Sequence, residues 1–285
     1  MIWKRSHFVL IISQTDKKMN KTVLITGASS GFGLAVANTL KNNGYNVIGT
    51  SRNPEKYQNK VSFKLIQLDL DNEQSIQSFS QLLLKETQTV DVLINNAGYM
   101  LKGLAEETPI EIGKKQFETN FWGTVELTNQ ILPIFRKQKS GKIITVSSFV
   151  GLIGHPNISF YSASKHALEG YFKSLRFELS QFNVKVAMVE PQYFKTNLGP
   201  NSIQSSTGIA DYDDFRKKVI IYTDKSIADA PQPDAVLDKI VKLVEDKEPK
   251  FSNPIGKGTS IILTLQRLAY TTFEKSVLGM IAKSK

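Results

Sequence analysis

The sequence predicts an α/β fold with one doubly wound parallel sheet and helices on both of its faces. Short β-rich apolar runs alternate with stretches of helical spacing from residue 22 to residue 189, a pattern typical of parallel sheets. The strand-like runs are continuously apolar, as expected for strands buried on both faces. No internal repeat or low-complexity linker divides the 285 residues, so we expect one domain rather than two.

The predicted elements follow one another in regular order. The expected strands are residues 22–26, 46–50, 61–68, 90–94, 142–146 and 184–189. The expected helices are residues 32–42, 74–85, 117–137 and 161–179. In each of these helices apolar residues recur at helical spacing, which provides one face to bury against the sheet.

The pattern loosens after residue 189. Residues 197–232 hold Gly, Pro, Ser and Asp clusters around a mixed stretch at 213–221, and a segment of this length is usually a lid or binding loop. Residues 233–244 predict another helix. Residues 259–282 predict an apolar-rich terminal helix or helix pair, whose apolar stripe covers the core, lines a pocket or meets another subunit.

The first 18 residues are unusual. Lys4 and Arg5 precede an apolar stretch at residues 8–12, which is shorter than the roughly 7–15 residues of the apolar region in a signal peptide and has no small-residue cleavage site after it. The sequence restarts at Met19 and leads directly into the first strand. We expect residues 1–18 to be an extension outside the fold and residues 19–285 to form the single domain. A weak membrane-surface anchor is the alternative.

Composition excludes several classes of protein. There is no Cys, and the three His residues show no metal-ligand spacing, so disulfides and metal sites are not expected. No apolar run approaches the ~18 residues of a membrane span. The net charge is +10, from 36 basic and 26 acidic residues, but the basic residues are scattered. We expect a cytoplasmic protein with a basic surface and no nucleic-acid partner.

A glycine-rich turn joins the first strand to the first helix, in the sequence TGASSGFG at residues 26–33. Gly27 allows the tight turn, Gly31 lets the backbone approach a phosphate, and Gly33 lets the helix pack closely on the sheet. The helix N-terminus then faces the pyrophosphate. The motif predicts dinucleotide binding, with a plain structural turn as the alternative.

The spacing of this turn resembles that of the short-chain dehydrogenase/reductase family. Four further motifs of that family follow in the same order: NNAG at residues 95–98, Asn120 in TNFWG, Ser148 in ITVSS, and Tyr161 with Lys165 in YSASK. Ser148 precedes Tyr161 by 13 residues, which selects it over Ser147. The resemblance covers about residues 21–196 and implies a Rossmann-type fold. Its hydroxysteroid and retinol dehydrogenase-like branch is the most similar.

The resemblance implies a catalytic set of Asn120, Ser148, Tyr161 and Lys165. The glycine turn and the resemblance together imply a cofactor site of Gly27, Ser29, Ser30, Gly31, Phe32, Gly33, Arg52, Asp69, Asn96, Ala97, Gly98, Tyr161, Lys165, Pro191, Phe194 and Thr196.

Tyr161 and Lys165 lie four residues apart, which places them on one face of a helix. A free Tyr titrates near pH ~10, and we expect the Lys165 ammonium to lower the pKa of Tyr161. Such a phenol exchanges a proton with a carbonyl or alcohol oxygen, and Ser148 can hydrogen-bond the same oxygen. In the family Lys165 also binds the nicotinamide ribose, and Asn120 belongs to a water relay.

The end of the second strand selects the cofactor. NAD enzymes usually carry a carboxylate there, whereas this chain has Ser51 followed by Arg52. Arg binds a 2′-phosphate through a bidentate fork, so we expect NADP(H), with a solvated loop Arg as the alternative for Arg52. Asp69 matches an acidic residue of the family near the adenine, with capping of the helix near residue 74 as the alternative.

Two positions depart from or add to the family pattern. Gln192 replaces a Gly after Pro191, which would be strained at a positive φ. His155 lies between Ser148 and Tyr161, and an exposed loop His is favoured over a substrate contact. Candidates for the substrate side are Tyr99, Met100, Leu152, Tyr193 and Phe194, which suggest an apolar substrate.

The sequence therefore predicts an NADP(H)-dependent oxidoreductase that acts on a small-molecule carbonyl/alcohol pair, in the reductive direction. A catalytically silent NADP(H)-binding regulator or scaffold is the alternative, and the four intact catalytic residues disfavour it. A homo-oligomer is compatible with the terminal apolar stripe.

Overall fold

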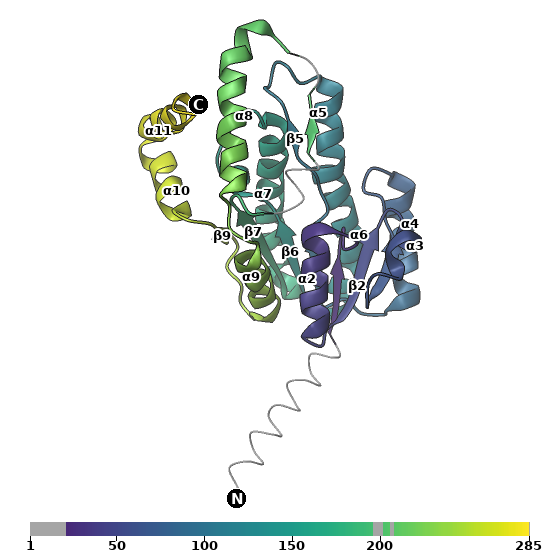
Figure 1. The fold of residues 1–285 in the computed structure, drawn as a ribbon. Coiled ribbons are helices and arrows are strands. Elements are labelled where there is room, and N and C mark those ends of the chain that lie inside the picture. Colours follow the sequence, from purple (N-terminus) through teal and green to yellow (C-terminus); the bar gives the residue numbers. More distant parts are fainter. Residues whose placement is uncertain (1–20, 196–201, 206–207, 285) are drawn as a thin grey trace, which may run out of the picture.

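A seven-stranded parallel sheet forms the centre of the computed structural model, which describes residues 21–195, 202–205 and 208–284 (Figure 1). The strand order is β3-β2-β1-β4-β6-β7-β9. The strands are β1 (Thr22–Ile25), β2 (Asn46–Ser51), β3 (Lys64–Gln67), β4 (Val92–Asn95), β6 (Gly141–Val146), β7 (Val184–Pro191) and β9 (Pro254–Ile255). The order reverses between β1 and β4, and ligands of doubly wound sheets bind beside this switch point.

Helices cover both faces of the sheet. α2 (Gly31–Asn42) and α9 (Asp234–Glu245) pack on one face, while α4 (Glu73–Glu86), α6 (Gly123–Gln138) and α7 (Ser159–Leu179) pack on the other. Successive strand residues point to opposite faces of the sheet. Leu24 therefore packs in the core under α4, α6 and α7, whereas Val23 packs in the core under α2 and α9. The predicted doubly wound architecture and its doubly buried strands are confirmed.

The helix expected at residues 117–137 is interrupted. α5 (Ile110–Phe117) runs into a π-helical turn at Glu118–Trp122, and α6 follows directly. The prediction placed the start of the helical region at residue 117 instead of Ile110. It also missed the π turn, because one wide turn does not change the apolar spacing of the whole helix. Such turns are frequent at functional sites, and this one carries Asn120.

Some short elements carry too few residues for a periodic signal. α3 (Pro54–Gln58) follows β2, and β5 (Leu101–Lys102) pairs with β8 (Ile203–Gln204) as a separate two-stranded sheet. β9 extends the main sheet by pairing with the end of β7.

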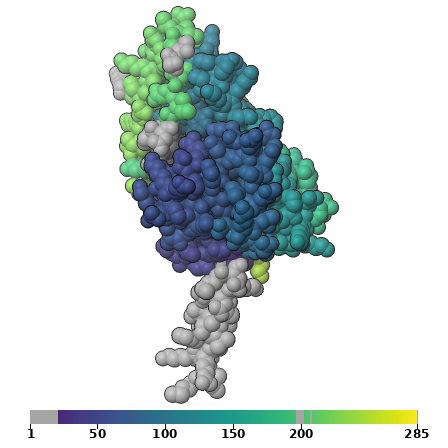
Figure 2. Space-filling model, turned by 90° about the vertical axis from the view of Figure 1, so that its right-hand side faces the viewer, coloured from purple at the N-terminus to yellow at the C-terminus, as the bar shows by residue number. Residues whose placement is uncertain are grey.

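Three helices lie beyond the predicted Rossmann-type core: α8 (Asp213–Ala228), α10 (Thr259–Leu268) and α11 (Tyr270–Ala282). The terminal apolar segment is thus the helix pair among the two alternatives. In a side view the N-terminal half forms one broad purple-to-blue face, and the green residues around α8 lie above it (Figure 2). In the part of the chain that is described, no helix has the length and apolar character needed to span a membrane. Residues 1–18, Thr196 and part of the expected lid fall outside the described residues.

Candidate active site

A cavity of about 1320 Å³ lies beside the strand switch point, at the carboxyl ends of the strands. It extends from the glycine turn after β1 to α8, α10 and α11. The expected cofactor residues that line it are Gly27, Ser29, Ser30, Gly31, Phe32, Gly33, Arg52, Asp69, Asn96, Ala97, Gly98, Tyr161, Lys165, Pro191 and Phe194. Thr196 lies outside the described residues. Residues from widely separated parts of the chain are therefore brought to one cavity.

The glycine turn is held in shape by the segment after β4. Gly27 and Gly31 adopt positive φ values of 66° and 55°, which glycine tolerates without strain. The Asn96 amide donates to the Thr26 carbonyl at 2.9 Å, and the Thr26 hydroxyl accepts from the Asn96 N–H at 2.9 Å. A Cβ at Gly33 would lie 2.3 Å from the Gly27 carbonyl oxygen and 2.4 Å from Asn96 Nδ2. The two predicted motifs thus form one unit that requires glycine at position 33.

Arg52 and Asp69 line the same end of the cavity as the glycine turn. Arg52 is exposed at the end of β2, directly before α3. The Asp69 carboxylate accepts from the Asp71 N–H at 3.1 Å. Asn72, not Asp69, caps α4 by accepting from the Ser75 N–H, so the capping alternative for Asp69 is wrong.

Asn120 lies behind the cavity wall rather than in it. Its side chain is only 1% exposed. Its Oδ1 accepts from the Tyr99 N–H and its Nδ2 donates to the Tyr99 carbonyl, both at 3.0 Å. The amide thereby fixes the segment after β4, and a Cβ at Gly98 would lie 3.0 Å from Asn120 Oδ1.

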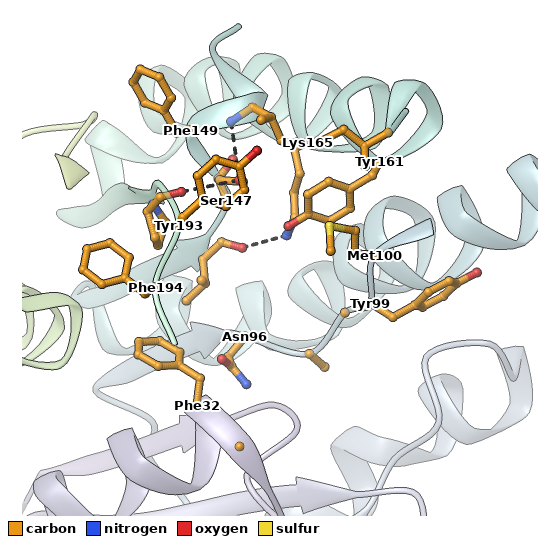
Figure 3. A pocket seen from close by; sticks show the side chains of 18 of the residues that line it. Phe32, Asn96, Tyr99, Met100, Ser147, Phe149, Tyr161, Lys165, Tyr193 and Phe194 are labelled. Atoms are coloured by element: carbon orange, nitrogen blue, oxygen red, sulfur yellow. Dashed lines mark hydrogen bonds between the residues drawn. The ribbon is translucent and has the colours of Figure 1, made fainter. Parts of the chain in front are cut away.

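Tyr161 and Lys165 project side by side from α7 into the cavity (Figure 3). Both side chains are buried, and Lys165 Nζ lies 5.7 Å from the centre of the Tyr161 ring. Lys165 Nζ donates to the Val146 carbonyl at 2.9 Å, at the end of β6. Ser148 follows that strand, lines the same cavity and hydrogen-bonds Tyr161. Three of the four expected catalytic residues thus meet at the cavity surface.

Burial controls the titration of this group. It raises the pKa of Tyr161 to about 12, and the hydrogen bond with Ser148 opposes that rise. Burial also lowers the pKa of Lys165 to about 8, while Glu169 raises it. The expectation that Lys165 lowers the pKa of Tyr161 is therefore wrong here, because loss of water around the phenol outweighs other effects. Tyr161 is protonated at neutral pH.

Two buried carboxyl groups stand beneath Lys165. Glu169 lies one turn further along α7, and Glu190 lies opposite on β7. Neither Glu169 oxygen has a hydrogen-bond partner among the described residues. Burial raises the pKa of Glu169 to about 7, and the negative charge of Glu190 adds to the rise. The Ser147 hydroxyl and the positive charges of Lys173 and Lys165 act in the opposite direction. Glu169 is thus a buried ionisable group placed to act on the charge of Lys165.

Comparison with known proteins identifies the family. Residues 21–206 match the family described as short chain dehydrogenase, which is more than half of the chain. The chain belongs to the short-chain dehydrogenase family.

Relatives and solved structures agree with this membership. An uncharacterized oxidoreductase, YusZ, from Bacillus subtilis is 38% identical over 276 residues, covering 91% of this chain and 98% of the relative. The 3-ketodihydrosphingosine reductase of Bacteroides thetaiotaomicron is 38% identical over 242 residues, covering 84% and 89%. The crystal structure of a short-chain dehydrogenase from Streptomyces avermitilis is 30% identical, covers 93% of this chain and 98% of that chain, and superposes with a TM-score of 0.78.

In this short-chain dehydrogenase, a polar cluster around His155 lies at the end of the cavity away from the glycine turn. His155 is half-buried and lines the cavity, so its interpretation as an exposed loop residue is wrong. Its Nε2 lies 3.2 Å from the Tyr193 hydroxyl, and its ring stacks on Tyr222 of α8 with 6.0 Å between centroids. Burial lowers the pKa of His155, which favours the neutral ring.

The other expected substrate-side residues mostly line this end. Tyr99, Met100, Tyr193 and Phe194 line the cavity, whereas Leu152 does not and its neighbour Ile153 does. Leu152 directly follows the 3₁₀ turn at Phe149–Gly151.

Gln192 also lines the cavity and is not among the residues with positive φ. The strain considered for this replacement is therefore absent. A glycine with a positive φ does pack against Gln192, but it is Gly256, whose φ is 145°. A Cβ at Gly256 would lie 2.3 Å from Gln192 Oε1.

The sequence indicated segments that could cover this cavity but not the individual residues that do so. They come from three helices late in the chain and comprise Tyr222, Thr223, Ser226 and Ile227 of α8, with Ile262, Leu265, Phe273, Ser276, Val277 and Met280 of α10 and α11. Two signals were available: the lid expected at residues 197–232, a range that includes α8, and the apolar spacing of residues 259–282, for which lining a pocket was among three interpretations.

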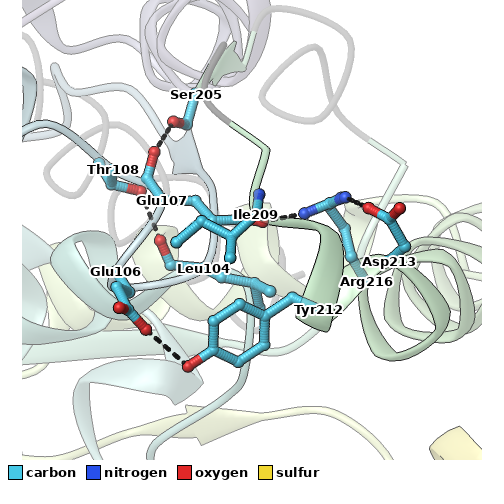
Figure 4. Close-up of polar contacts among 9 residues, drawn as sticks. All are labelled: Leu104, Glu106, Glu107, Thr108, Ser205, Ile209, Tyr212, Asp213 and Arg216. Carbon is cyan, nitrogen blue, oxygen red and sulfur yellow. Dashed lines mark hydrogen bonds and ion pairs between the residues drawn. The ribbon is translucent and has the colours of Figure 1, made fainter.

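A buried ion pair fastens α8 to the segment after β5 (Figure 4). The Glu107 side chain is 2% exposed and pairs with Arg216 of α8, which also pairs with Asp213. The Ile209 N–H donates to Glu107 Oε1 at 2.8 Å, and the Ser205 hydroxyl donates to the Glu107 carbonyl. One buried carboxylate therefore positions the start of the helix that closes the cavity.

Removing Arg216 should loosen α8. Arg216→Ala leaves the Glu107 charge buried without its partner, which costs about 3 kcal/mol and corresponds to roughly a hundredfold faster local amide exchange. Hydrogen exchange of the α8 peptide measures this. Lys218→Ala is the matched control, because Lys218 pairs with an exposed Asp214 on the same helix and such pairs contribute little. Equal protection of α8 in both variants would contradict the prediction.

Proposed function

We propose that the protein is an NADP(H)-dependent reductase of an apolar ketone or aldehyde, with Tyr161 as the general acid. One observation carries the proposal: a single cavity joins the glycine turn to Tyr161, Ser148 and Lys165 and continues into an apolar end. A silent regulator would have no need for a buried phenol and ammonium at that junction.

The residues present fit a nicotinamide dinucleotide. Gly31, Phe32 and Gly33 at the start of α2 line the cavity, and the N-terminus of a helix suits a pyrophosphate. Asn96, Ala97 and Gly98 line the middle of the path, and Pro191 and Phe194 line the far side. We assign the pyrophosphate to the glycine turn and the nicotinamide ribose to Tyr161 and Lys165.

In the proposed mechanism the Tyr161 hydroxyl is the proton donor. A nicotinamide dinucleotide held there would supply the hydride for the substrate carbon. The Tyr161 hydroxyl, protonated because its pKa is about 12, donates its proton to the carbonyl oxygen as negative charge develops there. Ser148 hydrogen-bonds the same oxygen, and the Lys165 ammonium stabilises the phenolate that remains. Asn120 acts at one remove, by holding the segment that includes Gly98 and Tyr99.

Arg52 supports the choice of NADP(H). It lines the cavity after β2, where Ser51 stands in place of a carboxylate. A guanidinium there complements a 2′-phosphate, whereas a carboxylate would repel it. Fluorescence titration with NADPH and NADH side by side tests the proposal, and tighter binding of NADH would contradict it.

Arg52→Ala should weaken NADPH binding at least about tenfold, since a charge-assisted hydrogen bond contributes about 1.5–3 kcal/mol. The affinity for NADH should stay unchanged, because NADH has no 2′-phosphate. The control Lys85→Ala removes an exposed cation from α4 and should alter neither affinity. If Arg52→Ala weakens both cofactors equally, Arg52 does not recognise the 2′-phosphate.

The apolar end of the cavity indicates the substrate class. Phe149, Ile153 and Phe273 form a small buried cluster there, with Ile262 and Leu265 packed against it. The relative from Bacteroides thetaiotaomicron is named 3-ketodihydrosphingosine reductase, and this name supports a ketone as substrate. We propose a carbonyl group attached to an apolar chain, enclosed by α8 as a lid.

Glu169→Gln should move the alkaline limb of the pH–kcat profile toward neutral pH. The Glu169 carboxylate raises the pKa of Lys165, so its removal lowers that pKa below about 8 and the ammonium is lost at a lower pH. Steady-state rates across pH, at saturating NADPH, measure the shift. Glu178→Gln, at an exposed carboxylate further along α7, is the control. An unchanged limb in Glu169→Gln would show that Glu169 does not govern the charge of Lys165.

A further inference from the structure

The last two helices expose several large apolar side chains. Ile261, Leu268, Tyr270, Leu278 and Met280 are between 44% and 77% exposed, and together they define the C-terminal apolar face. The six other large exposed apolar side chains of the described residues lie on six different elements. Exposed apolar groups gathered in this way mark an interaction site.

The inner side of the same helices is already occupied by the protein. Phe273 of α11 packs with Phe149 and Ile153, and Ile262 and Val277 pack against that cluster. In Figure 1 the yellow helices α10 and α11 stand outward from α8 and α9. A surface helix normally presents polar residues to water opposite its packed stripe. Ile261, Leu268 and Leu278 are exposed outside this packed stripe, so the apolar face extends beyond the surface that the protein itself covers.

The charges around this face select the partner. Lys257, Arg267, Lys275 and Lys283 are all exposed, and Glu274 is the single acidic residue between positions 257 and 284. Exposed apolar side chains with a basic rim are the pattern of helices that lie in a membrane interface, where anionic headgroups attract Lys and Arg. We propose that the C-terminal apolar face docks on an anionic lipid surface.

A second copy of the chain fits this face less well. A twofold interface would set the same patch against itself. The four cations and one carboxylate of each copy would then face a like-charged rim, which disfavours association. An anionic bilayer surface complements both the apolar side chains and the cations.

Docking there would connect the lipid to the cavity. Met280 lies on the same side of α11 as Phe273 and Val277 and lines the cavity with them, and it is still 44% exposed. An apolar substrate could pass between α8 and α11 without crossing water. This consequence rests on the proposed function, whereas the docking does not, so vesicle binding and turnover can fail separately.

Sedimentation of the full chain with vesicles tests the docking. We expect the protein to pellet with vesicles that contain phosphatidylserine, and much less with phosphatidylcholine alone or at high salt. Leu268→Glu and Ile261→Glu should each weaken the partition about tenfold or more, because each places a charge on the docking side. Phe177→Glu is the matched control, since Phe177 is 75% exposed on α7 and lies outside the face. Circular dichroism of each variant confirms that it is folded.

Three results would overturn the proposal. The first is no binding to either vesicle, and the second is a loss of binding in Phe177→Glu as large as in Leu268→Glu. The third is a concentration-dependent dimer, seen by light scattering, that Leu268→Glu dissociates while vesicle binding is absent. That last outcome would assign the face to a second copy.

Discussion

Tyr161→Phe should lower kcat about a thousandfold, within the range of general acid catalysis, while NADPH binding changes by less than about tenfold, the value of one hydrogen bond. The phenol is the group that hydrogen-bonds Ser148 in the cavity, so its loss removes the proposed proton donor and little else. Single-turnover rates with a ketone substrate, together with a fluorescence titration of NADPH, separate the two effects.

The same helix offers a control for the loss of a phenol. Tyr171 lies on α7, and its hydroxyl donates to Asn129 Oδ1 at 3.0 Å near the surface, away from the cavity. Tyr171→Phe should leave both kcat and cofactor affinity unchanged. Turnover at the wild-type rate in Tyr161→Phe would contradict its role as general acid. Loss of NADPH binding together with turnover would instead make Tyr161 mainly a cofactor ligand.

The sequence predicted well what local pattern and motif spacing control. Continuous apolar runs located six strands of the main sheet, and the glycine turn and Tyr161–Lys165 spacing located one end and the middle of the cavity. These features depend on residues close in the chain, whose geometry follows from one strand, one turn or one helix face.

Features that depend on distant contacts were not predicted. His155 is covered by Tyr193 and by Tyr222 from α8, which no local pattern around His155 indicates. The direction of the Tyr161 pKa is set by burial, whereas the sequence shows only that a Lys lies one turn away. Asn120 lies in the π turn, and its side chain hydrogen-bonds the backbone of Tyr99. This contact joins segments 21 residues apart, so local spacing does not reveal it.

Gly33 provides the second large expected effect, because here two distant motifs meet at one missing side chain. The Gly27 carbonyl and Asn96 Nδ2 would lie 2.3 Å and 2.4 Å from a Cβ at this position. The Asn96 amide is the one that donates to the Thr26 carbonyl, so the methyl group of Gly33→Ala would push apart the glycine turn and the segment after β4. Overpacking of this kind costs about 1–3 kcal/mol.

We therefore expect Gly33→Ala to weaken NADPH binding up to about a hundredfold, the affinity equivalent of that cost, and to lower the melting temperature. Gly170→Ala on α7 is the matched control, because a Cβ there meets nothing within 4 Å. An exposed helical Ala is more stable than Gly by about 0.5–1 kcal/mol, so this control should melt slightly higher and bind NADPH normally. A folded Gly33→Ala that binds NADPH like the wild type would show that the turn can widen without cost. The phosphate cradle would then not depend on the close approach of the two motifs.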